Sequence, residues 1–199
     1  MANQGVNQGR RRFLTASTAV VGAVGAGFAA VPFIQSWWPS ARAEAAGAPV
    51  RTDVSKLEPG QKMTVEWRGK PVFVFRRTQE MLELLPKQDP RLRDPNSDVE
   101  SQQPAFAKNG YRSIKPEIMV LVAICTHLGC VPEYVPEIGP QPYDEEWAGG
   151  LYCPCHKSRF DLAGRVYQGV PAPTNLVVPP YHFPDDNHVL IGVGPKEAA

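Results

Sequence analysis

All four cysteines of this chain lie in two short boxes, C-T-H-L-G-C beginning at Cys125 and C-P-C-H-K-S beginning at Cys153. In the first box Cys125 and His127 are two residues apart, so on an extended loop their side chains point the same way. In the second box Cys153 and His156 are separated by a turn that Pro154 keeps from being helical. Two such loops facing each other present two sulfurs and two imidazole nitrogens to one metal centre. Any fold of this chain must therefore hold the two boxes side by side.

Two other interpretations of the boxes remain open at this point. A zinc site can be built from four of the Cys and His side chains, although neither box has the four-Cys or Cys2His2 finger pattern. Alternatively, the cysteines form a structural disulfide and the histidines are incidental. The paired boxes favour an iron–sulfur cluster over both alternatives, because mixed Cys and His ligands at this spacing are far more specific than an ordinary short motif.

The two boxes resemble those of Rieske iron–sulfur proteins. In that family two cysteines bind one iron of a 2Fe–2S cluster and two histidines bind the other. Carried over by position, the resemblance implies that Cys125 and Cys153 are the thiolate ligands. It implies likewise that His127 and His156 are the imidazole ligands of one Rieske-type 2Fe–2S cluster.

The remaining residues of the boxes carry further roles in the family. The resemblance implies a disulfide between Cys130 and Cys155, and a Ser158 hydroxyl that bonds a bridging sulfide and raises the reduction potential. This cysteine pair is usually missing from Rieske ferredoxins and from oxygenase domains. Its presence therefore favours the high-potential branch of the family, which oxidises quinol.

Three residues are assigned to the reaction by the same resemblance. His156 is the first choice for the ligand that faces quinol and accepts its proton, and His127 is the second. Leu128 lies between a ligand and a disulfide cysteine, so it is expected to shield the cluster.

Outside the boxes, residues 169–173 (G-V-P-A-P) resemble the proline loop that packs beside the cluster in this family. The chain departs from the family pattern at three places. Phe160 stands where many high-potential members have a tyrosine that donates to a ligand sulfur, so the potential is expected to be lower. Val170 is an apparent insertion in the proline loop. Residues 131–152, between the boxes, form a longer segment than in mitochondrial relatives.

The N-terminal region has a different character. Residues 10–14 (R-R-R-F-L) fit a twin-arginine export signal, and residues 13–41 contain no charged side chain. Residues 14–37 are long and apolar enough to cross a bilayer, and the arginines before them favour a cytoplasmic N-terminus. Cleavage at the A-x-A pattern of residues 41–43 is the alternative. An uncleaved anchor is the preferred interpretation.

These observations predict four parts. Residues 1–12 form a cytoplasmic leader, residues 13–39 a transmembrane anchor and residues 40–49 a flexible tether. Residues 50–199 form a periplasmic head of a size that supports one core, with the cluster-binding part at about residues 118–174. The net charge of +1 and the absence of a basic patch argue against a nucleic-acid partner.

The head is predicted to be mostly β, with short antiparallel strands in layers. A hairpin is expected from residues 62–67 and 72–76. A helix capped by Thr78 is expected to run through Leu85 and to be stopped by Pro86. Residues 91–110 are expected to be a surface loop. Further strands are expected at residues 117–124, 165–168, 175–178, 181–183 and 189–193.

The resemblance implies a function as the iron–sulfur subunit of a proteobacterial ubiquinol–cytochrome c reductase, the cytochrome bc1 complex. The implied partners are cytochrome b, cytochrome c1, ubiquinol and the lipid bilayer of the inner membrane, in a dimeric complex. Two alternatives are the small Rieske subunit of a periplasmic molybdenum oxidase and a binding module clamped by zinc.

Overall fold

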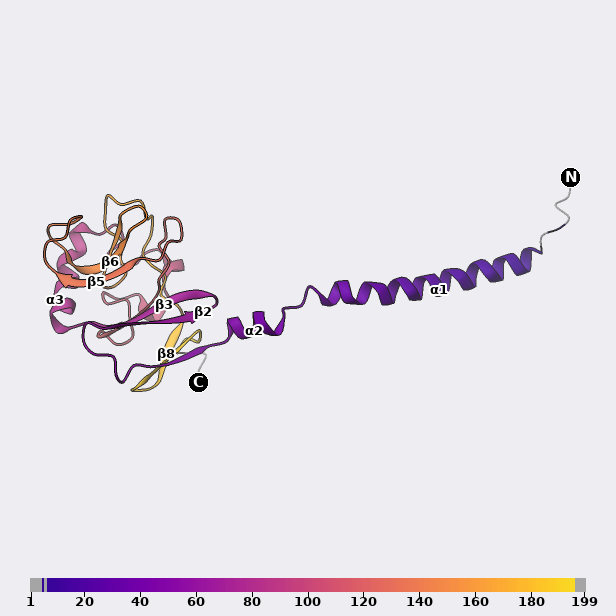
Figure 1. Cartoon of the computed structure of the whole chain (residues 1–199), viewed down its shortest axis with the longest axis horizontal. Coiled ribbons are helices and arrows are strands. Elements are labelled where there is room, and N and C mark those ends of the chain that lie inside the picture. The colour runs from indigo at the N-terminus through magenta and orange to yellow at the C-terminus, as the bar shows by residue number, and fades with distance from the viewer. Residues whose placement is uncertain (1–4, 6, 196–199) are drawn as a thin grey trace. The chain divides into compact units, whose positions relative to one another are not determined.

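The computed structural model describes residue 5 and residues 7–195 (Figure 1). The chain forms two compact units, Met1–Ala45 and Ala46–Ala199. Its helices are α1 (Gln8–Gln35), α2 (Ala41–Gly47), α3 (Gln79–Gln88), η1 (Asp89–Arg91), η2 (Glu100–Gln102) and η3 (Ala105–Ala107). Its strands are β1 (Val50–Asp53), β2 (Lys62–Trp67), β3 (Lys70–Arg76), β4 (Ile118–Val122), β5 (Glu133–Ile138), β6 (Ala148–Cys153), β7 (Ser158–Asp161), β8 (Tyr181–Asp185) and β9 (His188–Ile191).

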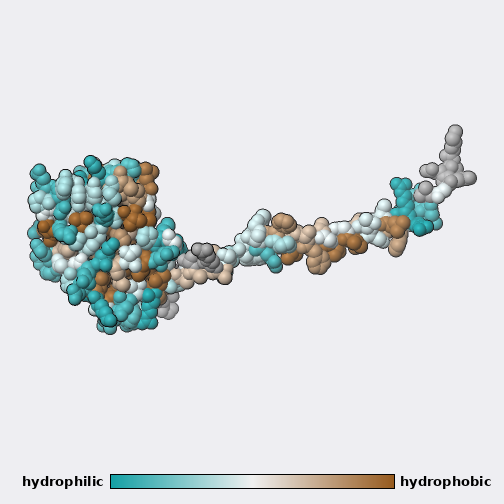
Figure 2. All heavy atoms as spheres, viewed as in Figure 1, coloured by the Kyte–Doolittle hydropathy of each residue, from teal (hydrophilic) through white to brown (hydrophobic). Residues whose placement is uncertain are grey.

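The N-terminal unit consists mainly of α1, which begins at a side-chain cap: Arg10 N–H donates to Asn7 Oδ1 over 3.1 Å. Within the described residues, α1 is the one helix that is long and apolar enough to cross a membrane. Figure 2 shows apolar side chains along much of it and polar ones near its N-terminal end. The predicted single apolar helix is therefore present, and at 28 residues it is roughly 40 Å long.

The second unit is built from antiparallel sheets, as predicted. Within its described residues the strands form three sheets in the orders β1-β9-β8, β2-β3-β4 and β5-β6-β7. Figure 1 shows β5 and β6 at one end of the unit, β2 and β3 in the middle and β8 at the other end. The fold class predicted from the sequence, a layered antiparallel head preceded by one long apolar helix, is confirmed.

The predicted β2–β3 hairpin is present, with exposure alternating along β2 but with residues 72–75 of β3 all buried. Arg68 and Gly69 form its two-residue turn with positive φ angles of 53° and 69°, the conformation that matches the twist of a tight hairpin. On its other edge β3 pairs with β4, with Val72 opposite Val122. Every residue of β4 is buried, and the chain then runs directly into the first box.

The β6–β7 hairpin was not predicted, and it carries the second box. Cys153 ends β6 and pairs with Ser158, the first residue of β7, so the intervening turn holds Cys155 and His156. In β6 a side chain at Gly150 would collide with the carbonyl oxygen of Phe160. The hairpin therefore depends on a residue that sequence alternation treats as a strand breaker.

The prediction that the helix ends at Pro86 is wrong, because α3 continues to Gln88. Its N-cap is as predicted: Thr78 Oγ1 accepts from Met81 N–H over 3.2 Å. Pro86 lies near the C-terminal end, where it removes only one backbone hydrogen bond. Burial of Met81 and Leu85 against the core holds the helix in place.

Residues 91–110 are also not a plain surface loop. They contain η2 and η3 and bury Leu92, Ser97, Gln103 and Ala107. The segment is ordered by its own polar groups, since Gln103 Nε2 donates to the carbonyl oxygens of Ser97 and Val99, both over 2.9 Å. The polar residues of this segment therefore include buried side chains that make hydrogen bonds as well as exposed ones.

Two of the predicted strands are absent. Residues 165–168 make only isolated bridges, Phe160 with Val166 and Leu92 with Tyr167. Residues 175–178 are extended without forming a strand, and one of their bonds runs from Val122 N–H to Val177 O over 2.8 Å. Strand-like composition in these segments reflects burial beside neighbouring segments rather than a continuous ladder.

Replacing Gly150 by alanine is expected to lower the free energy of unfolding by about 1–3 kcal/mol. The added methyl group would meet the Phe160 carbonyl and, at 2.9 Å, the Trp147 ring. Thermal or urea unfolding of the Gly150→Ala protein measures this effect. Gly110→Ala is the matched control because nothing lies within 4 Å of the position that its methyl group would take. Equal stability of the two variants would contradict the close packing of the hairpin.

Candidate metal centre

The two Cys and His boxes lie on two loops that a covalent bond joins. Cys130 of the first loop and Cys155 of the second form a disulfide with an S–S distance of 2.09 Å, as the resemblance implies. The first loop is closed on itself, because Cys125 N–H donates to Cys130 O over 2.8 Å and Gly129 N–H donates to Cys125 O over 3.0 Å. Gly129 has a φ of 83°, which a residue with a side chain rarely adopts.

The four side chains predicted to bind the cluster lie on these two loops. Cys125 and Cys153 are free thiols that are 2% and 1% exposed. The ring centroids of His127 and His156 are 4.7 Å apart, with their planes nearly perpendicular. The structure therefore brings the two imidazoles together from opposite boxes and leaves both thiols below the surface.

The local environment of these groups fits a metal centre. Burial raises the pKa of the Cys125 thiol, and the neighbouring Cys153 adds to this effect. Within the described residues, His127 Nδ1 is buried and has no hydrogen-bond partner. Buried polar atoms normally have a partner, so this unpartnered nitrogen is compatible with the predicted role of His127 as a metal ligand. Two thiols and two imidazoles are the donor set of a Rieske cluster.

Ser158 is fully buried beside the thiols. Its Oγ accepts a hydrogen bond from Ala172 N–H over 3.1 Å. Because the oxygen accepts from this amide, the hydroxyl hydrogen is available for another acceptor. The nearby Ser158 hydroxyl lowers the pKa of the Cys125 thiol and so opposes part of the effect of burial. The role of Ser158 as a donor to a bridging sulfide stays a prediction.

Leu128 is 70% exposed in the first loop. Its neighbour Thr126 has a different contact, since its Oγ1 donates to Thr174 O over 2.7 Å. This bond fastens the first box to the segment that follows the proline loop. The side chain of Leu128 is exposed to solvent on this loop. Its expected role in shielding the cluster stays a prediction.

The proline loop is held by a residue that the sequence analysis did not identify. Arg93 Nη1 donates to Ala172 O and Arg93 Nη2 donates to Val170 O, both over 3.0 Å. Val170, the apparent insertion, is buried. No local sequence signal points to Arg93, because it lies 77 residues before Val170.

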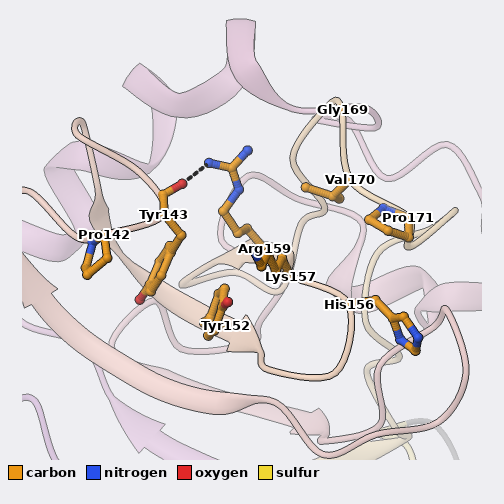
Figure 3. A pocket seen from close by; sticks show the side chains of 9 residues that line it. All are labelled: Pro142, Tyr143, Tyr152, His156, Lys157, Arg159, Gly169, Val170 and Pro171. Atoms are coloured by element: carbon orange, nitrogen blue, oxygen red, sulfur yellow. Dashed lines mark hydrogen bonds between the residues drawn. The ribbon is translucent and has the colours of Figure 1, made fainter.

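A hollow of about 400 Å³ lies beside His156 (Figure 3). Tyr143, from the long segment between the boxes, stacks on Tyr152 with ring centroids 3.9 Å apart. Arg159 Nη1 donates to Tyr143 O over 2.9 Å, which is the dashed bond in the figure. The full lining is Pro142, Tyr143, Tyr152, His156, Lys157, Arg159, Gly169, Val170 and Pro171.

The wall made by the long segment is anchored by charge. The Asp144 carboxylate, whose side chain is 4% exposed, accepts from Arg91 Nη2 over 2.7 Å and from Arg159 Nη1 over 3.1 Å. Trp147 Nε1 also donates to Val135 O over 3.1 Å. The extra length between the boxes therefore forms a fixed aromatic wall next to the second box.

Known proteins resemble the chain over nearly its whole length. The family model "Rieske 2Fe-2S domain" matches residues 49–182, and "Ubiquitinol-cytochrome C reductase Fe-S subunit TAT signal" matches residues 1–40. The ubiquinol-cytochrome c reductase iron-sulfur subunit of Allochromatium vinosum is 60% identical over 96% of this chain and 92% of its own length. The subunit of the same name from Rhodospirillum rubrum is 44% identical, covering 94% of each chain. A solved chain of a hyperthermophilic respiratory Complex III is 27% identical with a TM-score of 0.47, covering 88% of this chain and 98% of its own.

Removing the disulfide by the double change Cys130→Ala and Cys155→Ala is expected to destabilise the head by about 3.5 kcal/mol. This value is the loop-closure estimate for a bond that spans about 25 residues. Thermal unfolding of the purified full chain, followed by circular dichroism, measures the change. The unmodified chain under reducing conditions is the control and should lose a similar amount. An unchanged unfolding temperature in both would show that the loops are held without the bond.

Proposed function

We propose that this chain, which belongs to the Rieske iron–sulfur family, is the iron–sulfur subunit of a ubiquinol–cytochrome c reductase, a quinol-oxidising oxidoreductase. The observation that carries this conclusion is a Cys and His donor set on two disulfide-linked loops, in a chain 60% identical to a relative of that name. The cofactor of the family is one Rieske 2Fe–2S cluster.

In this proposal Cys125 and Cys153 bind one iron, and His127 and His156 bind the other. The bound cluster supplies a one-electron acceptor, with a reduction potential in the range of about −150 to +300 mV for such centres. A bound cation would offset the penalty that burial places on the Cys125 thiolate. Ser158 donates its hydroxyl hydrogen towards the sulfurs.

His156 is proposed as the side chain that meets ubiquinol. It is exposed at the rim of the hollow, whereas His127 is half-buried. An imidazole holds or releases a proton near neutral pH, so an exposed ring nitrogen suits acceptance of a hydrogen bond and a proton from a quinol hydroxyl. His127 is the second choice. Leu128, the exposed apolar residue of the first loop, limits access of water to this side.

The proposed partners are cytochrome b, which holds the quinol, and cytochrome c1, which receives the electron, in a dimeric complex. The proposed location is the bacterial inner membrane, with residues 1–12 in the cytoplasm and residues 50–199 in the periplasm. The match of residues 1–40 to an export signal and the apolar α1 helix support a membrane-anchored subunit. Arg10, Arg11 and Arg12, just before the apolar stretch, support the orientation.

His156→Ala and His127→Ala are each expected to abolish the Rieske signal in low-temperature electron paramagnetic resonance of ascorbate-reduced membranes. The reason is that each change removes one of four ligands. His188→Ala is the control, because the His188 ring bonds to Asp185 and lies in β9. Zinc in place of iron, or co-purification with molybdenum rather than with b and c haems, would contradict the proposed function.

Stiffening the proposed tether at residues 40–49 is expected to slow turnover. The helix α2 within it is seven small or polar residues, A-R-A-E-A-A-G, which bury little apolar surface. Ala43→Pro with Ala45→Pro should reduce quinol-to-cytochrome c turnover severalfold and leave the paramagnetic signal of the cluster unchanged. Ala43→Gly with Ala45→Gly is the matched control. Normal turnover of the proline variant would exclude a requirement for movement of the head.

A further inference from the structure

Residues 91–94 form hydrogen bonds with the chain on both sides of the proline loop, at residues 166–168 before it and at Asn175 after it. Arg93 N–H donates to Val166 O over 2.9 Å, and Gln168 N–H donates to Arg91 O over 2.9 Å. After the proline loop, Asn175 Nδ2 donates to Asp94 O over 2.9 Å. Both ends of the loop are therefore hydrogen-bonded to residues 91–94, a segment that we call the strap.

Within this strap, the Arg93 side chain contacts the loop itself. Its two terminal nitrogens donate to the carbonyl oxygens of Val170 and Ala172, one on each side of Pro171. Prolines carry no N–H group, so a loop with Pro171 and Pro173 has few donors of its own for these carbonyls. The planar guanidinium fork fixes two acceptors at a set separation, which a single point charge does not do.

The bond chain continues to the candidate metal centre. Ala172 accepts from Arg93 through its carbonyl and donates through its amide to Ser158 Oγ, over 3.1 Å. Ser158 is fully buried, so this amide restricts how its hydroxyl turns. The hydroxyl hydrogen is not used in this bond, so it is available to an acceptor such as a sulfur of the proposed cluster.

We propose that Arg93 is a positioning residue for the electron-transfer reaction. It holds the proline loop so that the Ala172 amide orients the Ser158 hydroxyl towards the cluster sulfurs. This inference rests on the ligand assignment proposed above. A hydrogen bond to a cluster sulfur stabilises the reduced, more negative cluster. Arg93 therefore raises the reduction potential through Ser158, although it is exposed and does not touch a ligand.

The test is a double-mutant cycle on the full chain in its complex, in membranes. Arg93→Ala, Ser158→Ala and the double variant are compared by redox titration, with the paramagnetic signal as the readout. Arg93→Ala is expected to shift the midpoint potential downwards, by less than Ser158→Ala does. In the Ser158→Ala background the Arg93 change is expected to cause no further shift, because the two act through one path.

Arg51→Ala is the matched control and should leave the potential unchanged. Arg51 is also an exposed arginine, but it pairs with Asp185 over 2.9 Å between strands β1 and β8. An equal downward shift from Arg93→Ala in both backgrounds would mean that only its positive charge acts on the cluster, which overturns the proposal. An unshifted potential in the Arg93→Ala protein overturns it as well.

Amide hydrogen exchange gives a second readout that does not depend on the cluster. Loss of Arg93 is expected to speed exchange of the Ala172 amide severalfold and to leave exchange in β9 unchanged. Unchanged exchange at Ala172 would show that the loop is held without Arg93. Absence of any Rieske signal in the unmodified protein is a different result. It rejects the proposed function, while the exchange measurement still decides the role of Arg93.

Discussion

The structure depends on holding two loops at a fixed separation, because each supplies only half of the donor set. Each loop follows a well-paired strand: the first continues from the buried β4, and the second is the turn between β6 and β7. The Cys130–Cys155 disulfide then joins the loop tips. The strands set the direction of each loop and the disulfide sets the distance. In this arrangement the ring centroids of His127 and His156 are 4.7 Å apart.

Segments of the head outside the strands have backbone carbonyl groups without strand partners, and buried arginines donate to several of them. Arg77 donates to the carbonyls of Tyr111, Pro116 and Leu162, and Arg112 donates to that of Ala163, among others. Burial lowers the pKa of both guanidinium groups to about 10, so both stay charged at neutral pH. One arginine has five donors in a fixed plane. One arginine can therefore hold several segments of the chain together through their carbonyl groups.

The same network supports the end of β7. Asp161 and Arg165 form an ion pair of 2.7 Å in which both side chains are almost fully buried. Asp161 also accepts from the backbone N–H groups of Ala163 and Arg165 over 2.9 and 2.8 Å. Such a pair contributes mainly by fixing one arrangement of the turn, because desolvation offsets much of its attraction. The turn determines the direction in which the chain leaves the second box for the proline loop.

The sequence predicts the parts of the site that are local. The two boxes, the β2–β3 hairpin and the cap at Thr78 each rest on neighbours within a few residues, and the structure has the hairpin and the cap. The β6–β7 hairpin was missed because A-G-G-L-Y-C lacks alternation and Gly150 reads as a breaker. The packing of residues 91–110 was missed because a polar composition does not show which side chains bond to backbone, either within the segment or far along the chain. Arg93 is such a case, with its acceptors more than 70 residues away.

The phenylalanine at position 160 makes the contacts that orient Ser158 more important. Its side chain is fully buried in β7, and it has no hydroxyl to donate to a ligand sulfur. Of the two hydroxyl groups that the family resemblance puts beside the sulfurs, only that of Ser158 is present. The orientation of one side chain therefore controls a larger share of the hydrogen bonding to sulfur than in relatives with tyrosine. That orientation is restricted by the Ala172 amide, so in the proposal above the proline loop affects the electronic properties of the centre.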